Sequence, residues 1–401
     1  MIDKRRILAV TFMASFAGVL LQRGGYFFTH DVLAFSQSEN LWFALGFGVV
    51  YVLGAASSHN LAARFGERRM LLAALAFLVL IHLALAVWPS AHVFAVSFIA
   101  MAGVIGAQWP ILESFMSAGE TPLRLARALG RYNLSWALSV PPALTLAGPL
   151  IASGSPRLLF LVAAALYAAA LIGCRALPAR PPHLDSGHAE RPKADRLPRL
   201  RALLWCARLA MLESYVLLFL LAPLMPEIMR GVGLGVSVAT RASALLDVAR
   251  VAIFLGLFLS ARWHDKSAPL ALSIAALPAG FFMVLFGTSL PVVVCGELLF
   301  GLAAGFVYFA ALYYAQLVEN ASVDAGGAHE ALIGVGYALG PGAGLVGTAL
   351  AHGAGPGSTA YVHGMLIAVT PLVVLGTIAA TRPLLVAKPA QVLEEPETPP
   401  R

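Results

Sequence analysis

The chain is built, almost from end to end, of apolar runs about 20 residues long, the length that an α-helix needs to cross the hydrocarbon core of a bilayer. Hydrophobic residues make up 59% of its 401 residues and charged residues only 12%, whereas soluble domains are about half apolar and about a quarter charged. A water-soluble fold could not cover this much apolar surface. The sequence therefore predicts an all-α integral membrane protein.

The limits of the apolar runs predict twelve transmembrane helices in two pseudo-symmetric six-helix bundles, at residues 1–175 and 202–381. A Pro-rich, charged cytoplasmic linker is predicted at 176–201 and a disordered cytoplasmic tail at 382–401. The predicted helices are 7–28, 41–62, 70–88, 92–117, 132–152, 157–175, 202–225, 240–262, 269–287, 292–316, 330–352 and 360–380.

Lys and Arg residues predict the orientation of the chain, because cytoplasmic loops retain positive charge during insertion. Most of the 27 Lys and Arg residues fall on the side of the N-terminus, the linker and the tail. Both termini are therefore predicted to be cytoplasmic, in the inner membrane of a bacterium. The net charge of +7 arises from these loops in the lipid bilayer and does not indicate a nucleic-acid partner.

An internal repeat relates the two predicted bundles. The segment Ala63–Arg68, after the second helix, reads Ala-Arg-Phe-Gly-Glu-Arg, and Ala261–Lys266, after the eighth, reads Ala-Arg-Trp-His-Asp-Lys. A Gly-Pro pair likewise occurs at Gly148 in the fifth helix and at Gly340 in the eleventh. The matching positions predict duplication of a six-helix unit.

Six plus six helices, a long cytoplasmic linker and a basic turn after helix 2 together resemble the major facilitator superfamily of secondary transporters. In its loop signature, Gly-x-x-x-Asp-Arg-x-Gly-x-Arg, the first Gly is replaced here by His59 and the Asp by Ala63, which implies altered gating. The resemblance implies that the halves rock about a midplane site, that helices 1, 4, 7 and 10 line the cavity, and that the loops after helices 2 and 8 take part in gating. The gating residues are Arg64, Gly66 and Arg68, which match the signature, and Arg262, Asp265 and Lys266 in the repeat.

Charged residues inside the predicted helices mark a candidate substrate and coupling site. A charge at bilayer depth costs at least about 2.5 to 3.5 kcal/mol, so it persists mainly where it faces water, a partner or a substrate. Most of these charges lie on the four helices that the resemblance places around the cavity, and the others lie on helix 8. They are Arg23, Glu113, Arg208, Glu213, Asp247, Arg250 and Glu297.

The depth of each charge along its helix, at about 1.5 Å per residue, predicts three ion pairs between helices. Asp247 is left as the unmatched acid, and it is a candidate proton carrier because desolvation favours the neutral form of a carboxyl group. Static pairs that hold helices in register would explain the same residues, and the sequence leaves both roles open. The predicted pairs are Arg23 with Glu297, Glu213 with Arg250, and Arg208 with Glu113.

Polar and aromatic residues at similar depths are predicted to line the cavity. Trp109 precedes a proline and is also typical of a helix kink, and the tyrosines are also candidates for anchors at the membrane interface. The predicted lining residues are Gln108, Trp109, Asn133, Trp136, Tyr308, Tyr313 and Glu330.

The sequence offers no motif for a metal, a cofactor or ATP. His329 and Glu330 begin like a zinc-protease helix, but Ile333 stands where the second histidine must fall. The Gly-rich segment 334–347 lies in a predicted membrane helix and not after a soluble strand. No cofactor and no metal are therefore predicted.

The sequence predicts a secondary active transporter that moves a small organic solute by alternating access and works as a monomer. Proton coupling is favoured over sodium, because acids dominate the buried charges and no pair of Gly/Pro-broken helices is evident that could cage a metal ion. Antiport is favoured by the Gly-Pro pairs, which resemble a helix 5 signature of antiporters in the family. Two alternatives remain open: a membrane enzyme or lipid-handling protein, for which no nucleophile with its base is found, and a transporter-like receptor that no longer cycles.

Overall fold

The computed structural model describes residues 4–117, 119–120, 122–181, 195–318 and 323–386. All regular elements among these residues are α-helices. In chain order they are α1 (Lys4–Gln22), α2 (Gly24–Asp31), α3 (Gln37–Phe65), α4 (Glu67–Val87), α5 (Ala91–Ser117), α6 (Pro122–Ala152), α7 (Arg157–Cys174), α8 (Leu197–Gly231), α9 (Val236–Ala242), α10 (Leu245–Leu259), α11 (Ala268–Leu285), α12 (Leu290–Val318), α13 (Val323–Leu350) and α14 (Thr359–Val386).

The helices provide 12 candidate membrane spans, which confirms the predicted fold class. α1 and α2 together form the first span, Lys4–Asp31, and α9 with α10 form the eighth, Val236–Leu259. Many observed helices run beyond the predicted ends, as α8 does at Leu197–Gly231 against the predicted 202–225. The extra turns follow from helix hydrogen bonding, which continues through polar residues that hydropathy alone assigns to the loops.

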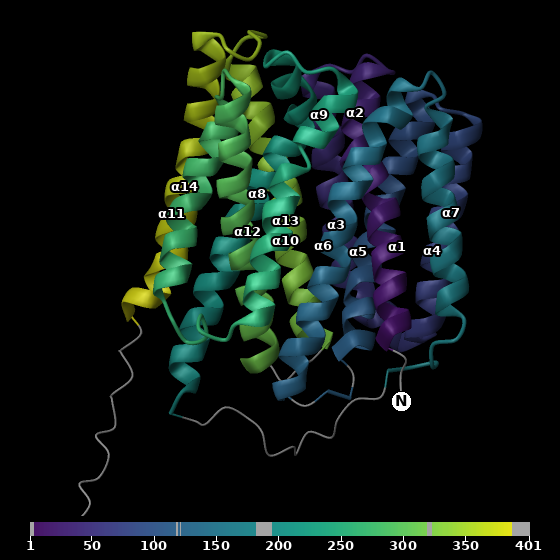
Figure 1. The fold of residues 1–401 in the computed structure, drawn as a ribbon, viewed down its shortest axis with the longest axis vertical. Coiled ribbons are helices and arrows are strands. Elements are labelled where there is room, and N and C mark those ends of the chain that lie inside the picture. The colour runs from purple at the N-terminus through teal and green to yellow at the C-terminus, as the bar shows by residue number, and fades with distance from the viewer. Residues whose placement is uncertain (1–3, 118, 121, 182–194, 319–322, 387–401) are drawn as a thin grey trace, which may run out of the picture.

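The helices form two groups that lie side by side, α1–α7 and α8–α14 (Figure 1). The seam between the groups is formed by α3 against α13 and by α6 against α9 and α10. We call the lower end of the bundle in Figure 1, which carries the N-terminus, the N-terminal end, and the opposite end the far end. The predicted linker and tail fall largely on 182–194 and 387–401, outside the described residues.

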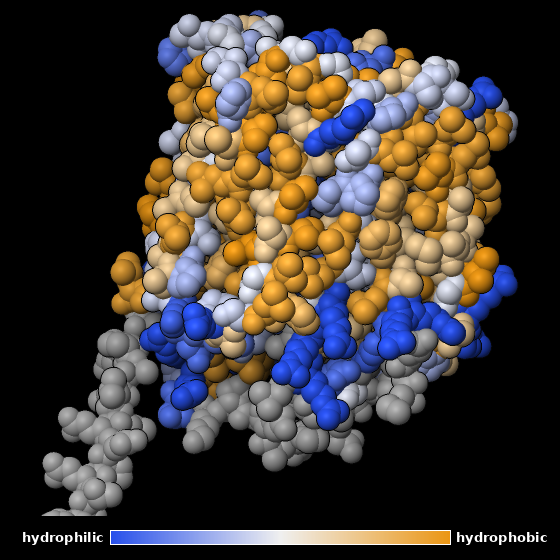
Figure 2. Space-filling model, in the orientation of Figure 1, coloured by the Kyte–Doolittle hydropathy of each residue, from blue (hydrophilic) through white to orange (hydrophobic). Residues whose placement is uncertain are grey.

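The lateral surface of the bundle is apolar. Figure 2 shows hydrophobic residues over most of the visible face and hydrophilic residues gathered at the N-terminal end. Large aliphatic side chains are exposed in the middle of helices, such as Leu80 on α4 at 63% and Ile367 on α14 at 64%. Because apolar surface in water costs about 25 cal/mol per Å², this surface fits contact with lipid tails.

Glycines allow the closest contacts between helices. A Cβ atom added to Gly54 on α3 would meet the carbonyl of Gly103 on α5, and one added to Gly301 on α12 would meet the carbonyl of Leu246 on α10. The opposing atoms belong to the backbone, which cannot turn aside as the end of a side chain can. Small residues at such crossings are typical of helix packing in membranes.

We expect Gly54→Val to destabilise the protein, because the new side chain would force α3 and α5 apart. The expected loss is about 1–3 kcal/mol, measured as a lower midpoint of thermal unfolding of the detergent-solubilised protein. Gly256→Val on α10 is the matched control, since a Cβ atom there meets nothing within 4 Å. Equal unfolding midpoints for the two variants would contradict the packing role of Gly54.

Candidate substrate and coupling site

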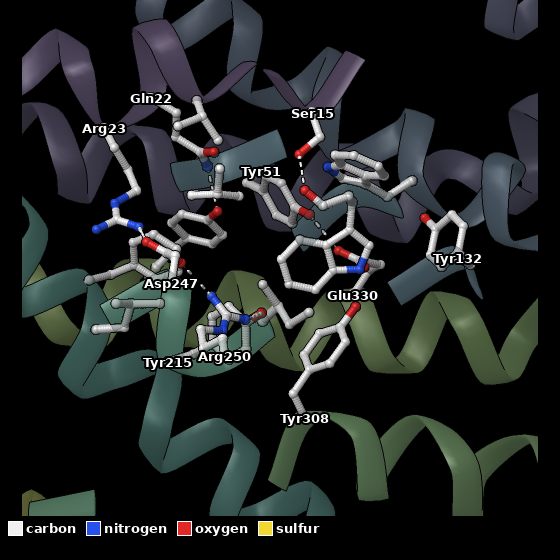
Figure 3. A pocket seen from close by; sticks show the side chains of 18 residues that line it. Ser15, Gln22, Arg23, Tyr51, Tyr132, Tyr215, Asp247, Arg250, Tyr308 and Glu330 are labelled. Carbon is white, nitrogen blue, oxygen red and sulfur yellow. Dashed lines mark hydrogen bonds and ion pairs between the residues drawn. The ribbon is translucent and has the colours of Figure 1, made fainter. Parts of the chain in front are cut away.

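A cavity of ≈ 100 Å³ lies at the seam between the two groups of helices. Its wall comes from α1, α3, α5 and α6 on one side and from α8, α10, α12 and α13 on the other. The wall thus includes the first, fourth, seventh and tenth spans, and also the second, fifth, eighth and eleventh. Its polar side chains, shown in Figure 3, are Ser15, Gln22, Arg23, Tyr51, Tyr132, Tyr215, Asp247, Arg250, Tyr308, Glu330 and Tyr337.

Three charged side chains meet at one side of the cavity (Figure 3). Asp247 on α10 accepts a hydrogen bond from Arg23 through Oδ2 and one from Arg250 through Oδ1 at 3.5 Å. Arg23 also donates to the backbone carbonyl of Ser243 at 3.3 Å. One carboxylate therefore links an arginine of the first half to an arginine of the second.

Two breaks in the helices position this charged triad. α1 and α2 are separated at Arg23, and α9 and α10 at Ser243 and Ala244. At the second break the amide of Asp247 donates to the carbonyl of Ala244 at 3.0 Å, which leaves the carbonyl of Ser243 to accept from Arg23. The interpretation that no broken pair of helices exists was wrong, because Ser243 and Ala244 provide no Gly or Pro signal. A guanidinium group bonds to the freed carbonyl.

Aromatic rings surround the guanidinium group of Arg250. Its central carbon lies 5.0 Å from the ring centre of Trp136 and 5.9 Å from those of Tyr215 and Tyr308. The group also donates to the hydroxyl of Tyr215 at 3.3 Å. Desolvated cation–π contacts contribute about 2 kcal/mol or more. They hold Arg250 in one orientation, while its Nε has no hydrogen-bond partner among the described residues.

The rest of the wall carries tyrosines and one acid. Tyr51 on α3 donates to Glu330 on α13, and Gln22 on α1 donates to the hydroxyl of Tyr337 on α13. The rings of Tyr51 and Tyr337 also pack together, with their centres 4.8 Å apart. Each of these contacts crosses the seam, so the wall depends on both halves.

Four of the seven predicted charges lie outside the cavity wall. Glu297 on α12 is 0% exposed, and its carboxyl oxygens have no hydrogen-bond partner among the described residues. Glu213 on α8 accepts a hydrogen bond from Thr377 on α14 at 3.2 Å. Glu113 and Arg208 are buried on α5 and α8, toward the N-terminal end.

The structure pairs the charges differently from the sequence prediction. Arg23 meets Asp247 and not Glu297. Arg250 likewise meets Asp247 and not Glu213. Asp247 is therefore the shared partner of two arginines, and the prediction that it is the unmatched acid was wrong.

The third predicted pair is not formed either, since neither carboxyl oxygen of Glu113 has a hydrogen-bond partner among the described residues, Arg208 included. The reason for these errors is that depth along a helix does not give direction around it. Glu213 and Tyr215 are two residues apart, which turns their side chains by about 200°. Tyr215 faces the cavity, and Glu213 faces α14.

The predicted lining residues divide into two sets. The structure places Trp109, Trp136, Tyr308 and Glu330 at the cavity. The others lie elsewhere: Gln108 is buried without a partner for Oε1 among the described residues, Asn133 accepts from Trp136 Nε1 at 3.2 Å, and Tyr313 stacks on His264 with ring centres 4.5 Å apart.

Sequence reasoning missed much of the wall. The missed residues are uncharged, and most belong to helices 2, 5, 7 and 11, where the search for charges gave little weight to tyrosine. A tyrosine near the middle of an apolar run was the available signal, because a buried hydroxyl usually needs a partner. The missed residues are Ser15, Gln22, Tyr51, Tyr132, Tyr215, Phe219 and Tyr337.

The two predicted gating loops make similar connections at the N-terminal end. Gly66 turns the chain between α3 and α4 with a φ of 86°, and Arg68 donates to the carbonyl of Leu177, after α7, at 2.9 Å. In the loop after α10, the carbonyl of Asp265 accepts from Arg199 at the start of α8 at 2.7 Å. Each loop is thus bonded to the segment that flanks the predicted linker.

The other loop residues differ between the repeats. Arg64 lies over the ring of Phe65 at 5.2 Å, whereas Arg262 and Lys266 are exposed. Trp263, the counterpart of Phe65, is 7% exposed and Phe65 is 51% exposed. The repeat is therefore imperfect at the level of packing.

The two halves contact each other on both sides of the cavity. Toward the far end, a side chain on Gly148 of α6 would meet Thr240 of α9. Toward the N-terminal end, a Cβ atom on Gly130 of α6 would lie 2.6 Å from the ring of Phe258 on α10. The cavity is therefore held between two contact regions of the seam.

Residues 7–341 match the sequence profile of the Major Facilitator Superfamily, and the chain belongs to this family. The family consists of membrane transporters, which confirms the prediction of a transporter and of a chain that is not an enzyme. A search of curated proteins finds no match.

Solved transporter structures share the fold. The human organic anion transporter MFSD10 is 19% identical with a TM-score of 0.65, and the alignment covers 95% of this chain and 100% of that chain. A bacterial homolog of the human lysosomal transporter Spinster, inward-facing and unoccupied, is 18% identical with a TM-score of 0.69 and coverage of 95% and 96%. The nucleoside transporter NupG is 13% identical with a TM-score of 0.65 and coverage of 95% and 99%.

Proposed function

We propose that the chain is a secondary active transporter that moves a small organic solute by alternating access and exchanges it for protons. The observation that carries the proposal is the cavity at the seam, whose wall needs both halves and contains Arg23, Asp247 and Arg250. Rocking of the halves would separate Arg23 from Asp247 and expose the cavity to one side of the membrane at a time.

The chemistry of the wall favours a solute with a planar or aromatic part and an anionic or strongly polar group. Arg23 and Arg250 share one carboxylate, and Arg250 keeps a free Nε donor among aromatic rings. Guanidinium groups recognise carboxylates and phosphates through paired donors, and aromatic side chains stack on planar solutes. The structural neighbours include transporters described as acting on organic anions and on nucleosides.

Proton coupling is supported by acids that are buried without a hydrogen-bonding partner among the described residues, namely Glu113 and Glu297. A buried carboxylate without compensation is unfavourable, so such groups are suited to carrying a proton. Exchange is favoured by Gly148, whose Gly-Pro pair lies in the seam, where rocking must open the contact.

We further propose that the chain works as a monomer in a bacterial inner membrane, with 1–175 and 202–381 as the two moving bundles and the N-terminal end in the cytoplasm. The hydrophilic residues gathered at that end in Figure 2 support this orientation. The loops that contain Arg68 and Asp265 lie there and are proposed to gate the cytoplasmic side.

Solute-driven proton movement in proteoliposomes tests the proposed function. With a pH dye inside, benzoate or uridine should change the internal pH, and a protonophore should abolish the change. Asp247→Asn should lower the rate at least about tenfold, because both guanidinium groups lose their buried counter-charge. Glu297→Gln should stop proton movement and leave unlabelled-for-labelled solute exchange intact. Full proton coupling in both variants would contradict the proposal.

The matched control is Glu39→Gln at the exposed far end. The glutamine can still accept from the backbone of Ser36 in the capping box of α3. This variant removes an acid without touching the cavity and is expected to move protons at the wild-type rate.

A further inference from the structure

Two buried acids, one from each half, face each other across the seam at the cytoplasmic side of the cavity. Glu330 on α13 lines the cavity, and Glu113 on α5 is 2% exposed. A Cβ atom added to Gly326 on α13 would lie 2.7 Å from Glu113 Oε2, so this carboxyl group rests against the backbone of the opposite half. Gly326 and Glu330 are four residues apart and share a helix face, which places the two carboxyl groups together.

Hydroxyl groups surround the two acids, and they differ in what they offer. Tyr51 from α3 donates to Glu330, whereas Glu113 accepts no hydrogen bond from the described residues. Tyr132 from α6 and Tyr308 from α12 lie within electrostatic range of both acids. A single hydrogen bond does not compensate two carboxylates in a buried site.

Basic groups near the pair have other neighbours. Arg23 and Arg250 line the same cavity as Glu330, but both are bonded to Asp247. His329, beside Glu330, packs edge-on against Tyr308, and Arg208 on α8 lies within electrostatic range of His329. No ion pair joins a base to Glu113 or Glu330 among the described residues. Two like charges this close cannot both be ionised at low cost.

We propose that Glu113 and Glu330 form a proton-operated latch, in which one proton shared between the two carboxyl groups holds the cytoplasmic side of the seam closed. Loss of that proton to the cytoplasm leaves two carboxylates that repel each other, and the halves separate there. Closing reverses the step: one carboxylate takes up one proton and no bond to carbon forms or breaks. The latch rests on the proposed function only in that its opening is the step that faces the cavity to the cytoplasm.

The sign of the pH dependence follows from this arrangement. The closed form binds one proton more than the open form, so the closed population falls as the pH rises. Removing one charge by Glu113→Gln or Glu330→Gln removes the repulsion, so each variant stays closed over the whole range. Glu120→Gln is the matched control, because Glu120 pairs with Lys4 inside one half at 3.6 Å and does not cross the seam.

Distances between spin labels test the latch without any solute. Labels at Arg69→Cys on α4 and Ser267→Cys before α11 report on exposed positions in the two halves, in protein whose native cysteines are replaced by alanine. Between about pH 5.5 and about pH 8.5 the population at the longer distance should rise by at least about tenfold, the change that one pH unit produces in a one-proton equilibrium. Both glutamine variants should keep the short distance at both pH values, and Glu120→Gln should follow the wild type.

A distance distribution that does not change with pH in the wild type would overturn the latch, and so would a wild-type response in both glutamine variants. Each variant is first checked for a single peak in size-exclusion chromatography, and the second variant replaces one that does not fold. Because no solute is present, a pH-dependent seam in a protein that transports nothing would support the latch and reject the proposed transport. Proton-coupled transport with an unresponsive seam would do the opposite.

Discussion

Replacing Arg250 by methionine is expected to abolish transport. The change leaves Asp247 with Arg23 as its only ion-pair partner among the described residues and removes the cation that Trp136 and Tyr215 enclose. Breaking a buried ion pair in this way costs about 3–5 kcal/mol, or on the order of a hundredfold or more in solute binding. The solute also loses the free Nε donor of Arg250.

Exchange of labelled benzoate or uridine across proteoliposome membranes measures this effect. Arg250→Lys should recover only part of the rate, because lysine keeps the charge but lacks the planar fork that bonds Asp247 and Tyr215 together. Arg157→Met, at an exposed position at the start of α7, is the control and should exchange solute at the wild-type rate. Wild-type exchange by Arg250→Met would remove the cavity from the mechanism.

The number of helices was predictable because lipid imposes a simple rule on the chain. Every span must be long and apolar enough to satisfy its backbone internally, so each leaves a clear signal in the sequence. The breaks inside two spans were not predictable in the same way. Gly24 and Gly25 follow the break at Arg23, but nothing in Ser243 or Ala244 marks the second break.

The charges of the site were predictable as a set but not as pairs. Hydropathy identifies a charge inside a span, and its cost explains why Arg23, Asp247 and Arg250 gather at one cavity. The partner of each charge depends on rotation of the helix and on local breaks, which no single sequence reveals. Glu213 shows the limit: its depth matches that of Arg250, yet it faces Thr377 on α14.

The polar wall illustrates a second limit of the sequence. Tyr51, Tyr215 and Tyr337 occur in spans that carry other tyrosines or phenylalanines, and only their position on the cavity side distinguishes them. Their hydroxyl groups find partners across the seam or beside a charge, as Tyr51 does with Glu330. The site is therefore a property of how the halves meet, and neither half contains it alone.

The same dependence on the seam makes a leucine at Gly148 the second large effect that we expect. Gly148 on α6 lies against Thr240, Ser237 and the carbonyl of Val236 on α9, so a branched side chain there cannot fit while the far end is closed. Gly148→Leu should hold the far end open and reduce solute exchange at least about tenfold, because each cycle requires this seam to close.

Reaction of a cysteine in the cavity with a membrane-impermeant thiol reagent measures the opening. Ser15→Cys lies in the wall, and in the closed seam its thiol is shielded. Adding Gly148→Leu should make this thiol react from the far side of the membrane at least about tenfold faster, since an open far end places it in contact with water. Gly256→Leu, where an added Cβ meets nothing within 4 Å, should leave the rate unchanged. If the thiol in Gly148→Leu reacted no faster than in the control, the contact between α6 and α9 would not be the far gate.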